Sequence, residues 1–332
     1  QILYMDQVPD SAACNEAVKL AKKRGFSRLS GFVNGVLRNI SRKKETISYP
    51  KKDKNLVTYL SVTYSIPEWI IKFFMKTYDD ETVEKIIESY LEDKKTTLCC
   101  LMSKGGKDVI RKELEEENVT VEDGELIENA VKISDYDFLY RLRAFREGKC
   151  YVQDESSMLC AKLAGAKEGQ FVMDLCSAPG GKSLYTADQI KGSGQVLSRD
   201  LTEYKTDLIE DNIERMGFTN MEAEVFDATI LDEEHIEAAD VVIADVPCSG
   251  LGIMGKKNDI KYHISEDGMK DLVKLQREIL TNAVQYVKHG GTLIYSTCTI
   301  NPEENEKNMQ WIINNFDYEA VDITEELPKN LK

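Results

Sequence analysis

The sequence predicts an α/β fold with a doubly wound parallel sheet, because apolar strand patterns alternate with helical patterns from about residue 150 onward. Five segments have the pattern of buried strands, at 171–175, 195–199, 222–226, 240–244 and 291–297. Helical spacing predicts helices near 182–190, 203–215 and 269–287. A glycine turn joins the first strand to the first helix, as in sheets that bind a ligand at the carboxyl ends of their strands.

The chain begins with a basic helical segment. Residues 11–24 and 29–41 have helical apolar spacing, and residues 1–54 contain twelve Lys or Arg against five Asp or Glu, a net of +7. The whole chain carries −15, so the remainder carries −22. An acidic chain argues against a general nucleic-acid binder, whereas its basic head fits either phosphate contacts or a solvated helix face. The basic side chains of the predicted helices are Lys22, Lys23, Arg24, Arg28, Arg38, Arg42, Lys43 and Lys44.

The middle of the chain predicts a small α+β adaptor. Residues 45–60 have the composition of a linker, and helical patterns follow from Ile66 and from Asp80. An apolar run TLCCLM, a charged helix KDVIRKELEEEN and short strands come next, the strands near 119–122, 131–133 and 150–153. We therefore expect three parts: a helical head, the adaptor and the α/β domain, at 1–45, 46–148 and 149–332.

The glycine turn lies in FVMDLCSAPGGKS, residues 171–183. Pro179 presets one backbone angle, and Gly180 and Gly181 allow positive φ and a close approach of ligand to main chain. A Walker loop is excluded because Cys176 stands where that motif has its first glycine, and a dinucleotide fingerprint is absent. From this stretch alone, a ligand loop and a purely structural turn both remain open.

Acidic residues and cysteines follow the other strands. Asp200 and Asp227 suit the ribose and adenine of a nucleoside, although either alone would more often cap a loop. Asp245 and Cys248 follow the fourth strand and Cys298 follows the fifth. Because the carboxyl ends of parallel strands meet at one edge, we expect both thiols to converge on one pocket, whereas a lone buried cysteine is commonly inert.

Composition argues against several other classes of protein. Eight cysteines without a C-x-x-C pair fit a reducing compartment, and three isolated histidines predict no metal site. No apolar run approaches the roughly 18 residues of a membrane span. We therefore expect a cytoplasmic monomer with no membrane partner. The opening at Gln1 and the charged end at Lys332 suggest a trimmed chain.

Several phrases carry a family resemblance. FVMDLCSAPGGKS, DVPCSGLG and YSTCTINPEENE resemble the RNA cytosine-5 methyltransferases, and YVQDESSML is similar to the lead-in to their catalytic domain. The head, VPDSAACNEAVKLAKKRGFSRLSGFVNGVLRNISR, resembles the end of the antiterminator-like helical domain of the bacterial 16S ribosomal RNA enzymes of the Sun or Fmu type. The resemblance covers nearly the whole chain. It implies a Rossmann-like S-adenosylmethionine methyltransferase domain after an adaptor and the remnant of an all-helical domain.

The resemblance also implies a role for each motif residue. It makes Cys298 the nucleophile, assigns Cys248 to product release and places Asp245 at N3 and the amino edge of the base. It implies S-adenosylmethionine as cofactor, without a metal, held by Cys176, Ser177, Ala178, Pro179, Gly180, Gly181, Lys182, Asp200, Asp227 and Asp245. Lys182 is also a candidate to lower a cysteine pKa. The loop after Cys248 offers three candidates for phosphate contacts: Lys256, Lys257 and Lys261.

The predicted function is methyl transfer to carbon 5 of a specific cytosine in free or partly assembled 16S ribosomal RNA, through a covalent cysteine–cytosine intermediate. Two alternatives stay open, namely the same reaction on tRNA or another RNA, and a noncatalytic RNA-binding factor in ribosome assembly. Two segments depart from the family pattern, GKKNDIKY after the Gly-Leu-Gly and TLCCLMSKGG in the adaptor.

Overall fold

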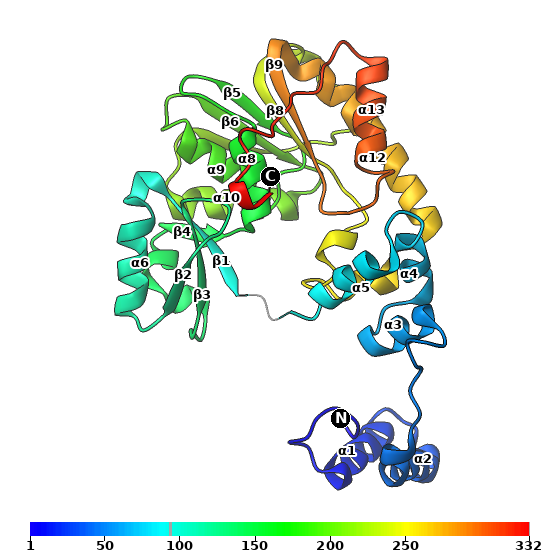
Figure 1. Ribbon diagram of the computed structural model, residues 1–332. Helices are drawn as coiled ribbons and strands as arrows, with labels where there is room; N and C mark the ends of the chain where they lie inside the picture. Colours follow the sequence, from blue (N-terminus) through cyan, green and yellow to red (C-terminus); the bar gives the residue numbers. More distant parts are fainter. Residues whose placement is uncertain (93–94, 332) are drawn as a thin grey trace. The chain divides into compact units, whose positions relative to one another are not determined.

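The computed structural model describes residues 1–92 and 95–331. The chain forms two compact units, Gln1–Glu88 and Ser89–Lys332, and Figure 1 shows the elements of each. The three-part division at 1–45, 46–148 and 149–332 stays a prediction. Over the described ranges, none of the helices is long and apolar enough to cross a bilayer.

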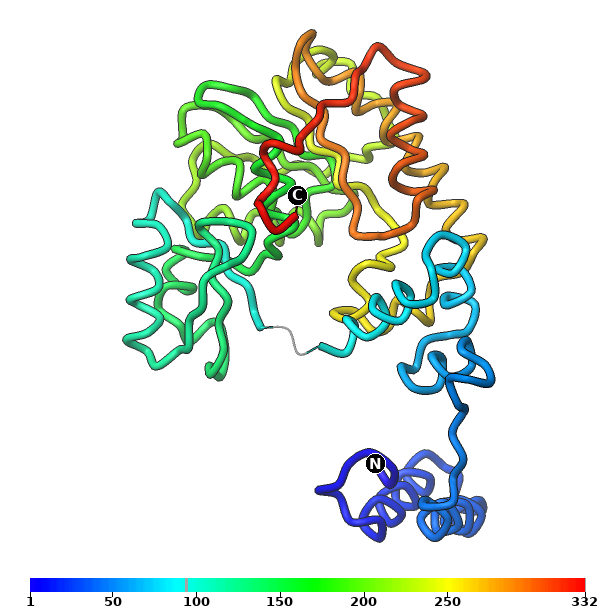
Figure 2. The backbone as a smooth tube through the Cα atoms, in the orientation of Figure 1, coloured from blue at the N-terminus to red at the C-terminus, as the bar shows by residue number. Residues whose placement is uncertain are grey.

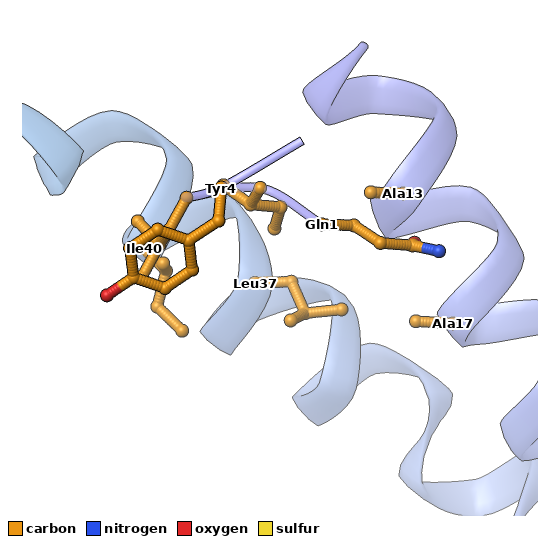
Figure 3. A pocket seen from close by; sticks show the side chains of 8 residues that line it. Gln1, Tyr4, Ala13, Ala17, Leu37 and Ile40 are labelled. Atoms are coloured by element: carbon orange, nitrogen blue, oxygen red, sulfur yellow. The ribbon is translucent and has the colours of Figure 1, made fainter. Parts of the chain in front are cut away.

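The first unit is helical. Its helices are α1 (Asp10–Lys23), α2 (Ser30–Lys43), α3 (Leu56–Tyr64), α4 (Glu68–Phe74) and α5 (Asp80–Ser89). Ala13 and Cys14 of α1 are buried, whereas Phe32 of the apolar face of α2 is 71% exposed. Figure 3 shows a hollow between α1 and α2 that is lined mainly by apolar side chains such as Ala17 and Leu37.

The predicted linker at 45–60 is partly wrong, because α3 already begins at Leu56. Asn55 caps this helix, and its side-chain oxygen accepts a hydrogen bond of 3.1 Å from the backbone N–H of Thr58. Pro50 and the KKDK run before it favoured an irregular segment. The capping asparagine was the local signal for the helix start.

The second unit contains a small antiparallel sheet in the order β2-β3-β1-β4. Its elements are β1 (Thr96–Cys100), α6 (Gly106–Glu116), β2 (Thr120–Asp123), β3 (Ala130–Ser134), α7 (Arg143–Arg146) and β4 (Cys150–Val152). Ile110 and Leu114 of α6 pack with Leu98 and Val131 in one apolar cluster. This packing covers one face of the adaptor sheet and explains why an amphipathic helix lies between its first two strands.

The rest of the second unit is a five-stranded parallel sheet in the order β7-β6-β5-β8-β9. Its strands are β5 (Phe171–Asp174), β6 (Gln195–Asp200), β7 (Met221–Val225), β8 (Ala239–Asp245) and β9 (Val287–Ser296). Its helices are α8 (Glu155–Leu163), α9 (Gly181–Gln189), α10 (Glu203–Met216), α11 (Ile260–His263), α12 (Glu266–Tyr286) and α13 (Glu306–Asn315). All five predicted strands are present, and the predicted α/β fold is confirmed.

Alternating side chains of the strands serve two different cores. Val172 and Val241 pack with α8 and α9, whereas Met173 and Val242 pack with α12 and α13 on the opposite face (Figure 1). A strand period of two residues places neighbouring side chains on opposite faces, so a sheet covered on both sides needs apolar residues at every position. This explains the continuous apolar runs in the sequence.

Two details of this part differ from the sequence prediction. β9 begins at Val287 rather than 291, because Val287 pairs with Ala239 across an irregular register. The helices α8, α11 and α13 were not predicted. After α13, Figure 2 shows the chain running back past the sheet, and Leu327 reaches the core that contains α8 and α9.

The adaptor and the parallel sheet belong to one unit and are joined by specific contacts. Asp188 of α9 accepts hydrogen bonds from the backbone N–H groups of Met102 at 2.7 Å and Ser103 at 3.1 Å. The hydroxyl of Tyr151, the middle residue of β4, donates to the carbonyl oxygen of Gly181 at 3.2 Å. The end of β4 therefore lies against the start of α9, where the glycine turn ends.

Candidate active site

The carboxyl ends of the central strands form one edge of the parallel sheet. Register pairs Asp245 at the end of β8 with Ser296 at the end of β9, and β5 ends at Asp174, which pairs with Ile243 of β8. Loops after these strands carry the glycine turn, Cys248 and Cys298. This edge is where the sequence predicted a ligand site.

The glycine turn is a tight loop that hydrogen bonds attach to the underlying strands. Gly180 has φ +100°, a left-handed conformation that suits glycine, and it lies directly before α9. The Ser177 backbone N–H donates to the Arg199 carbonyl at 2.9 Å, and the Ser183 hydroxyl donates to Asp174 at 2.7 Å. These bonds fix the loop at the helix N-terminus, where backbone N–H groups are available to a ligand.

A cavity of about 180 Å³ opens above this loop. Most of the predicted cofactor residues line it, namely Cys176, Ser177, Ala178, Pro179, Gly181, Lys182 and Asp245. Four further polar residues line it that sequence reasoning had not assigned: Gln153, Asp154, Ser157 and Asp174. The cavity therefore combines the glycine loop with side chains from just after β4 and from the start of α8.

Asp200 and Asp227 lie outside the lining of this cavity. Asp200 is buried and accepts from the Ala178 backbone N–H at 2.9 Å and from Lys205 at 2.8 Å, so it supports the glycine loop. Asp227 accepts from the Thr229 backbone N–H at 2.9 Å and its hydroxyl at 2.7 Å, which lowers its pKa. Their assignment to ribose and adenine stays a prediction.

Lys182 and Asp245 form an ion pair at the cavity wall. The Lys182 ammonium donates to Asp245 at 2.5 Å and to the Ser157 hydroxyl at 3.0 Å. Burial disfavours the ammonium, but the Asp245 carboxylate more than offsets it and raises the pKa of Lys182 overall. The Ser296 hydroxyl donates to the other oxygen of Asp245 at 2.7 Å. Lys182 therefore orients the carboxylate of Asp245. Its charge also acts to lower the pKa of Cys160, which burial raises overall. An effect of Lys182 on Cys248 or Cys298 stays a prediction.

The two cysteines of the site meet. Their sulfur atoms are 3.1 Å apart, and the Cys298 backbone N–H donates to the Cys248 sulfur at 3.2 Å. The hydrogen bond from the Cys248 thiol lowers the pKa of Cys298, against the effects of burial and of the Asp245 charge, and the Lys257 charge lowers it further. The same hydrogen bond raises the pKa of Cys248. Of the two thiols, the exposed Cys298 therefore loses its proton more readily, and Cys248 beside it keeps its proton.

A buried carboxylate lies behind the cysteine loops. Glu304 is fully buried and accepts from the Ser249 backbone N–H at 2.8 Å, the Ser249 hydroxyl at 2.5 Å, Gln276 at 2.9 Å and Asn301 at 2.8 Å. Ser249 follows Cys248, and Asn301 follows the loop of Cys298. The segment PEENE has the composition of a charged, exposed turn. No local sequence pattern therefore indicated that its second glutamate, Glu304, is buried.

Asp174 was also missed, although it lies inside the predicted strand. Burial raises its pKa to about 6, against the hydrogen bond from Ser183 and the charge of Lys182. A carboxyl group whose folded-state pKa exceeds its ordinary value binds more protons in the folded state, so stability falls as the pH rises from about 4 to 6. The signal available in the sequence was an acid among strand residues that must be buried on both faces.

The three candidate phosphate contacts differ in the structure. Lys256 is paired with Asp154, and Lys257 is exposed near Cys298. Lys261 is buried, and its ammonium lies 5.3 Å from the ring centre of the exposed Tyr262. Its assignment as a phosphate contact stays a prediction.

The fold and the site together define the class as a Rossmann-like methyltransferase domain. Comparison with known proteins then gives the family. A model described as 16S rRNA methyltransferase RsmB/F matches residues 161–331, and a model of the NusB family matches residues 1–42. The chain belongs to the 16S rRNA methyltransferase RsmB/F family, which confirms the family resemblance read from the sequence motifs.

Individual relatives match along most of the chain. It is 36% identical to a probable ribosomal RNA small subunit methyltransferase B from Bacillus subtilis, over 100% of this chain and 74% of the relative. It is 30% identical to the Synechocystis protein of the same name, over 93% of this chain and 70% of the relative. The crystal structure of PH0851 superimposes with a TM-score of 0.83 at 29% identity, covering 95% of this chain and 70% of that one.

Proposed function

We propose that the protein transfers a methyl group from S-adenosylmethionine to carbon 5 of a cytosine in 16S ribosomal RNA, through a covalent bond between Cys298 and the base. The observation that carries the proposal is the pair of sulfur atoms 3.1 Å apart, on the two loops that follow β8 and β9. β8 ends at Asp245, which lines the cavity of the glycine loop. The pair provides a thiolate and a separate proton-bearing group, and this reaction needs both.

The cavity fits the methyl donor. Its wall contains buried polar atoms without a hydrogen-bond partner among the described residues, on Gln153 and Asp174, next to the backbone of the glycine loop. S-adenosylmethionine, when bound, supplies a methyl group on a positively charged sulfur. Lys182, Asp245 and the loop from Cys176 to Gly181 are the residues that we expect to hold it.

Cys298 begins the chemistry. Its thiolate adds to carbon 6 of the cytosine, the sulfur electron pair forms the S–C6 bond, and the double-bond pair moves so that carbon 5 becomes nucleophilic. With the donor bound, carbon 5 would use this pair to form its bond to the methyl group, while the bond between the methyl group and the donor sulfur breaks and leaves its electron pair on that sulfur, as S-adenosylhomocysteine. The pKa of Cys298, lowered by the thiol of Cys248, keeps the nucleophile ionised nearer neutral pH.

Asp245 is oriented to help this addition. Lys182 and Ser296 each bond one of its oxygens, and a third of the side chain remains exposed. A fixed carboxylate stabilises the positive charge of a base protonated at N3 and accepts from its amino group. The target base must leave its stack to reach a site at the sheet edge.

Cys248 is suited to product release. Once the Cys298 sulfur is bonded to carbon, it no longer accepts the proton of Cys248, and the largest cause of the raised Cys248 pKa is gone. Cys248 then loses its proton to solvent and takes the proton from carbon 5. The freed electron pair restores the C5–C6 double bond, and the Cys298 thiolate leaves.

The basic head supports RNA as the substrate. It carries a net +7 over residues 1–54, and its helices match the NusB family model. The relatives from Bacillus subtilis and Synechocystis are named for the RNA of the small ribosomal subunit. Monomeric state and cellular location stay predictions.

The test incubates the protein with methyl-labelled S-adenosylmethionine and protein-free 16S RNA, followed by bisulfite sequencing of the RNA. We expect label at one cytosine, no label with Cys298→Ala, and full activity with Cys14→Ala, a control cysteine outside the site. Cys248→Ala should accumulate a covalent RNA complex, visible as a slow band on a denaturing gel. Full methylation by Cys298→Ala would contradict the mechanism, and preference for tRNA in the same assay would contradict the substrate.

A further inference from the structure

Gln153 comes from the adaptor sheet, yet its side chain lies in the cavity of the glycine loop. It directly follows β4, and its backbone N–H donates to the carbonyl oxygen of Thr97 in β1 at 3.2 Å. Tyr151, two residues earlier, lies on the same side of the strand and donates to the carbonyl of Gly181. The adaptor sheet thus directs two consecutive inward side chains at the start of α9.

The amide of Gln153 rests directly on the glycine turn. A Cβ atom added to Gly181 would lie 3.1 Å from Gln153 Nε2 and 3.3 Å from its amide carbon. Glycine at this position therefore permits a contact that a larger residue would displace. The side chain has little room to turn away, because Gln153 is only 7% exposed.

Both polar atoms of this amide, Nε2 and Oε1, are buried without a hydrogen-bond partner among the described residues. The same is true of Asp174 Oδ1, which lines the same cavity. Buried polar groups are nearly always hydrogen-bonded in folded proteins, so three orphaned atoms in one cavity indicate a ligand. Together they offer one donor and two acceptors.

An α-amino acid group matches this set. Its carboxylate accepts from Nε2 and its ammonium donates to the two acceptors, of which the carboxyl group of Asp174 matches the positive charge of the ammonium, whereas a phosphate only accepts. A base edge also pairs with a glutamine amide, and a ligand that has adenine but no amino-acid group separates the two. We propose that Gln153 binds the amino-acid end of the methyl donor, with Nε2 donating to the carboxylate and Oε1, together with Asp174 Oδ1, accepting from the ammonium. This inference rests on the proposed use of S-adenosylmethionine.

The consequence is that the adaptor forms part of the donor site. Gln153 reaches the cavity only because the adaptor docks against α9 through Asp188 and the backbone of Met102 and Ser103. The neighbouring Asp154 lines the same cavity and pairs with Lys256, on the loop after Cys248. Donor binding and adaptor docking should therefore be coupled.

The test measures binding of S-adenosylhomocysteine to the full chain by calorimetry, without RNA. Gln153→Met keeps the length of the side chain and removes both hydrogen-bonding atoms. We expect it to weaken binding by roughly 100-fold or more, since it removes two hydrogen bonds to charged groups at a buried amide. Binding of 5′-methylthioadenosine, which lacks the amino-acid group, should change by less than about twofold.

Two further variants make the result specific. Gln189→Met is the matched control, because Gln189 Oε1 is also buried and unpartnered among the described residues but lines a different cavity. It should bind both ligands as the wild type does. Gln153→Glu sets a carboxylate against the carboxylate of the ligand and should weaken S-adenosylhomocysteine at least as much as Gln153→Met.

Several outcomes would overturn the inference. Unchanged S-adenosylhomocysteine affinity in Gln153→Met would show that this amide serves another ligand, such as the target base. If Gln153→Met weakened binding of both ligands equally, Gln153 would have a packing role. A lower melting temperature of the ligand-free variant, together with that equal loss of affinity, would point to the same role. A wild-type protein that binds neither ligand would remove the donor assignment itself, and this inference with it.

Discussion

Removing the thiol of Cys248 should make Cys298 a weaker acid. Cys248→Ala deletes the donor that lies 3.1 Å from the Cys298 sulfur and is the largest cause of its lowered pKa. A hydrogen bond to a charged acceptor contributes about 1.5–3 kcal/mol, and solvent screening at an exposed sulfur favours the lower end. About 1.4 kcal/mol corresponds to a tenfold smaller thiolate fraction at a fixed pH below the pKa.

The assay is alkylation of Cys298 by iodoacetamide, followed by mass spectrometry of its peptide at a series of pH values. Only the thiolate reacts, so a raised pKa moves the midpoint to higher pH and slows the reaction near pH 7 by about tenfold or somewhat less, because a more basic thiolate is more nucleophilic. Lys257→Gln removes a smaller cause of the lowered pKa and should shift the midpoint in the same direction by less.

Access to Cys298 changes when a neighbouring side chain is shortened, but access alters rates at every pH without moving the midpoint. Cys248→Ser keeps a donor and should give a midpoint between those of the wild type and Cys248→Ala. A midpoint in Cys248→Ala that stays in place or moves to lower pH would refute the assignment of donor and acceptor.

Three other perturbations test the buried acids and the basic head. Glu304→Ala should lower the free energy of unfolding in urea by about 3 kcal/mol, since it removes the acceptor of four buried hydrogen bonds, whereas the exposed Glu303→Ala should leave the midpoint unchanged. Asp174→Asn should raise stability at pH 7.5 by up to about 3 kcal/mol and lose this gain as the pH falls through 6 toward 4; a gain that persists at pH 4 would count against the raised pKa. Glutamine at three exposed basic positions of the head should reduce the salt dependence of RNA binding by roughly two to three in log–log slope, and an unchanged slope would place the RNA elsewhere; the positions are Lys22, Lys23 and Arg24.

The parts of the fold that follow from local patterns could be predicted from the sequence. Apolar runs gave the five parallel strands, and their carboxyl ends located Asp245, Cys248 and Cys298 at one edge, where the structure places the two sulfur atoms in contact. The glycine turn was recognised because positive φ at Gly180 has a local signature. Features that depend on one segment of the chain and its neighbours in sequence could therefore be predicted.

The roles of residues whose partners lie far away in the sequence could not be predicted. Gln153 reads as a polar residue after a short strand, and only the docking of the adaptor on α9 buries it beside Gly181. Glu304 reads as one charge of an exposed turn, yet its partners Ser249 and Gln276 lie 55 and 28 positions away. Burial of a polar group is set by such tertiary contacts, which no periodicity records.

The acidity of Cys298, the proposed nucleophile, should depend on a buried side chain that touches neither sulfur. Glu304 holds Ser249, the residue after Cys248, through two hydrogen bonds, and the Ser249 hydroxyl lies 2.7 Å from that of Thr299, the residue after Cys298. The loops that carry Cys248 and Cys298 are thus linked by hydrogen bonds to the side chain of Glu304. We expect this arrangement to set the 3.1 Å separation of the sulfur atoms. A loop freed from Glu304 would lengthen the hydrogen bond between the thiols, and the pKa of Cys298 would rise with the length of that bond. Glu304→Ala should therefore move the alkylation midpoint of Cys298 to higher pH in the folded protein, whereas loss of stability alone would leave the midpoint in place.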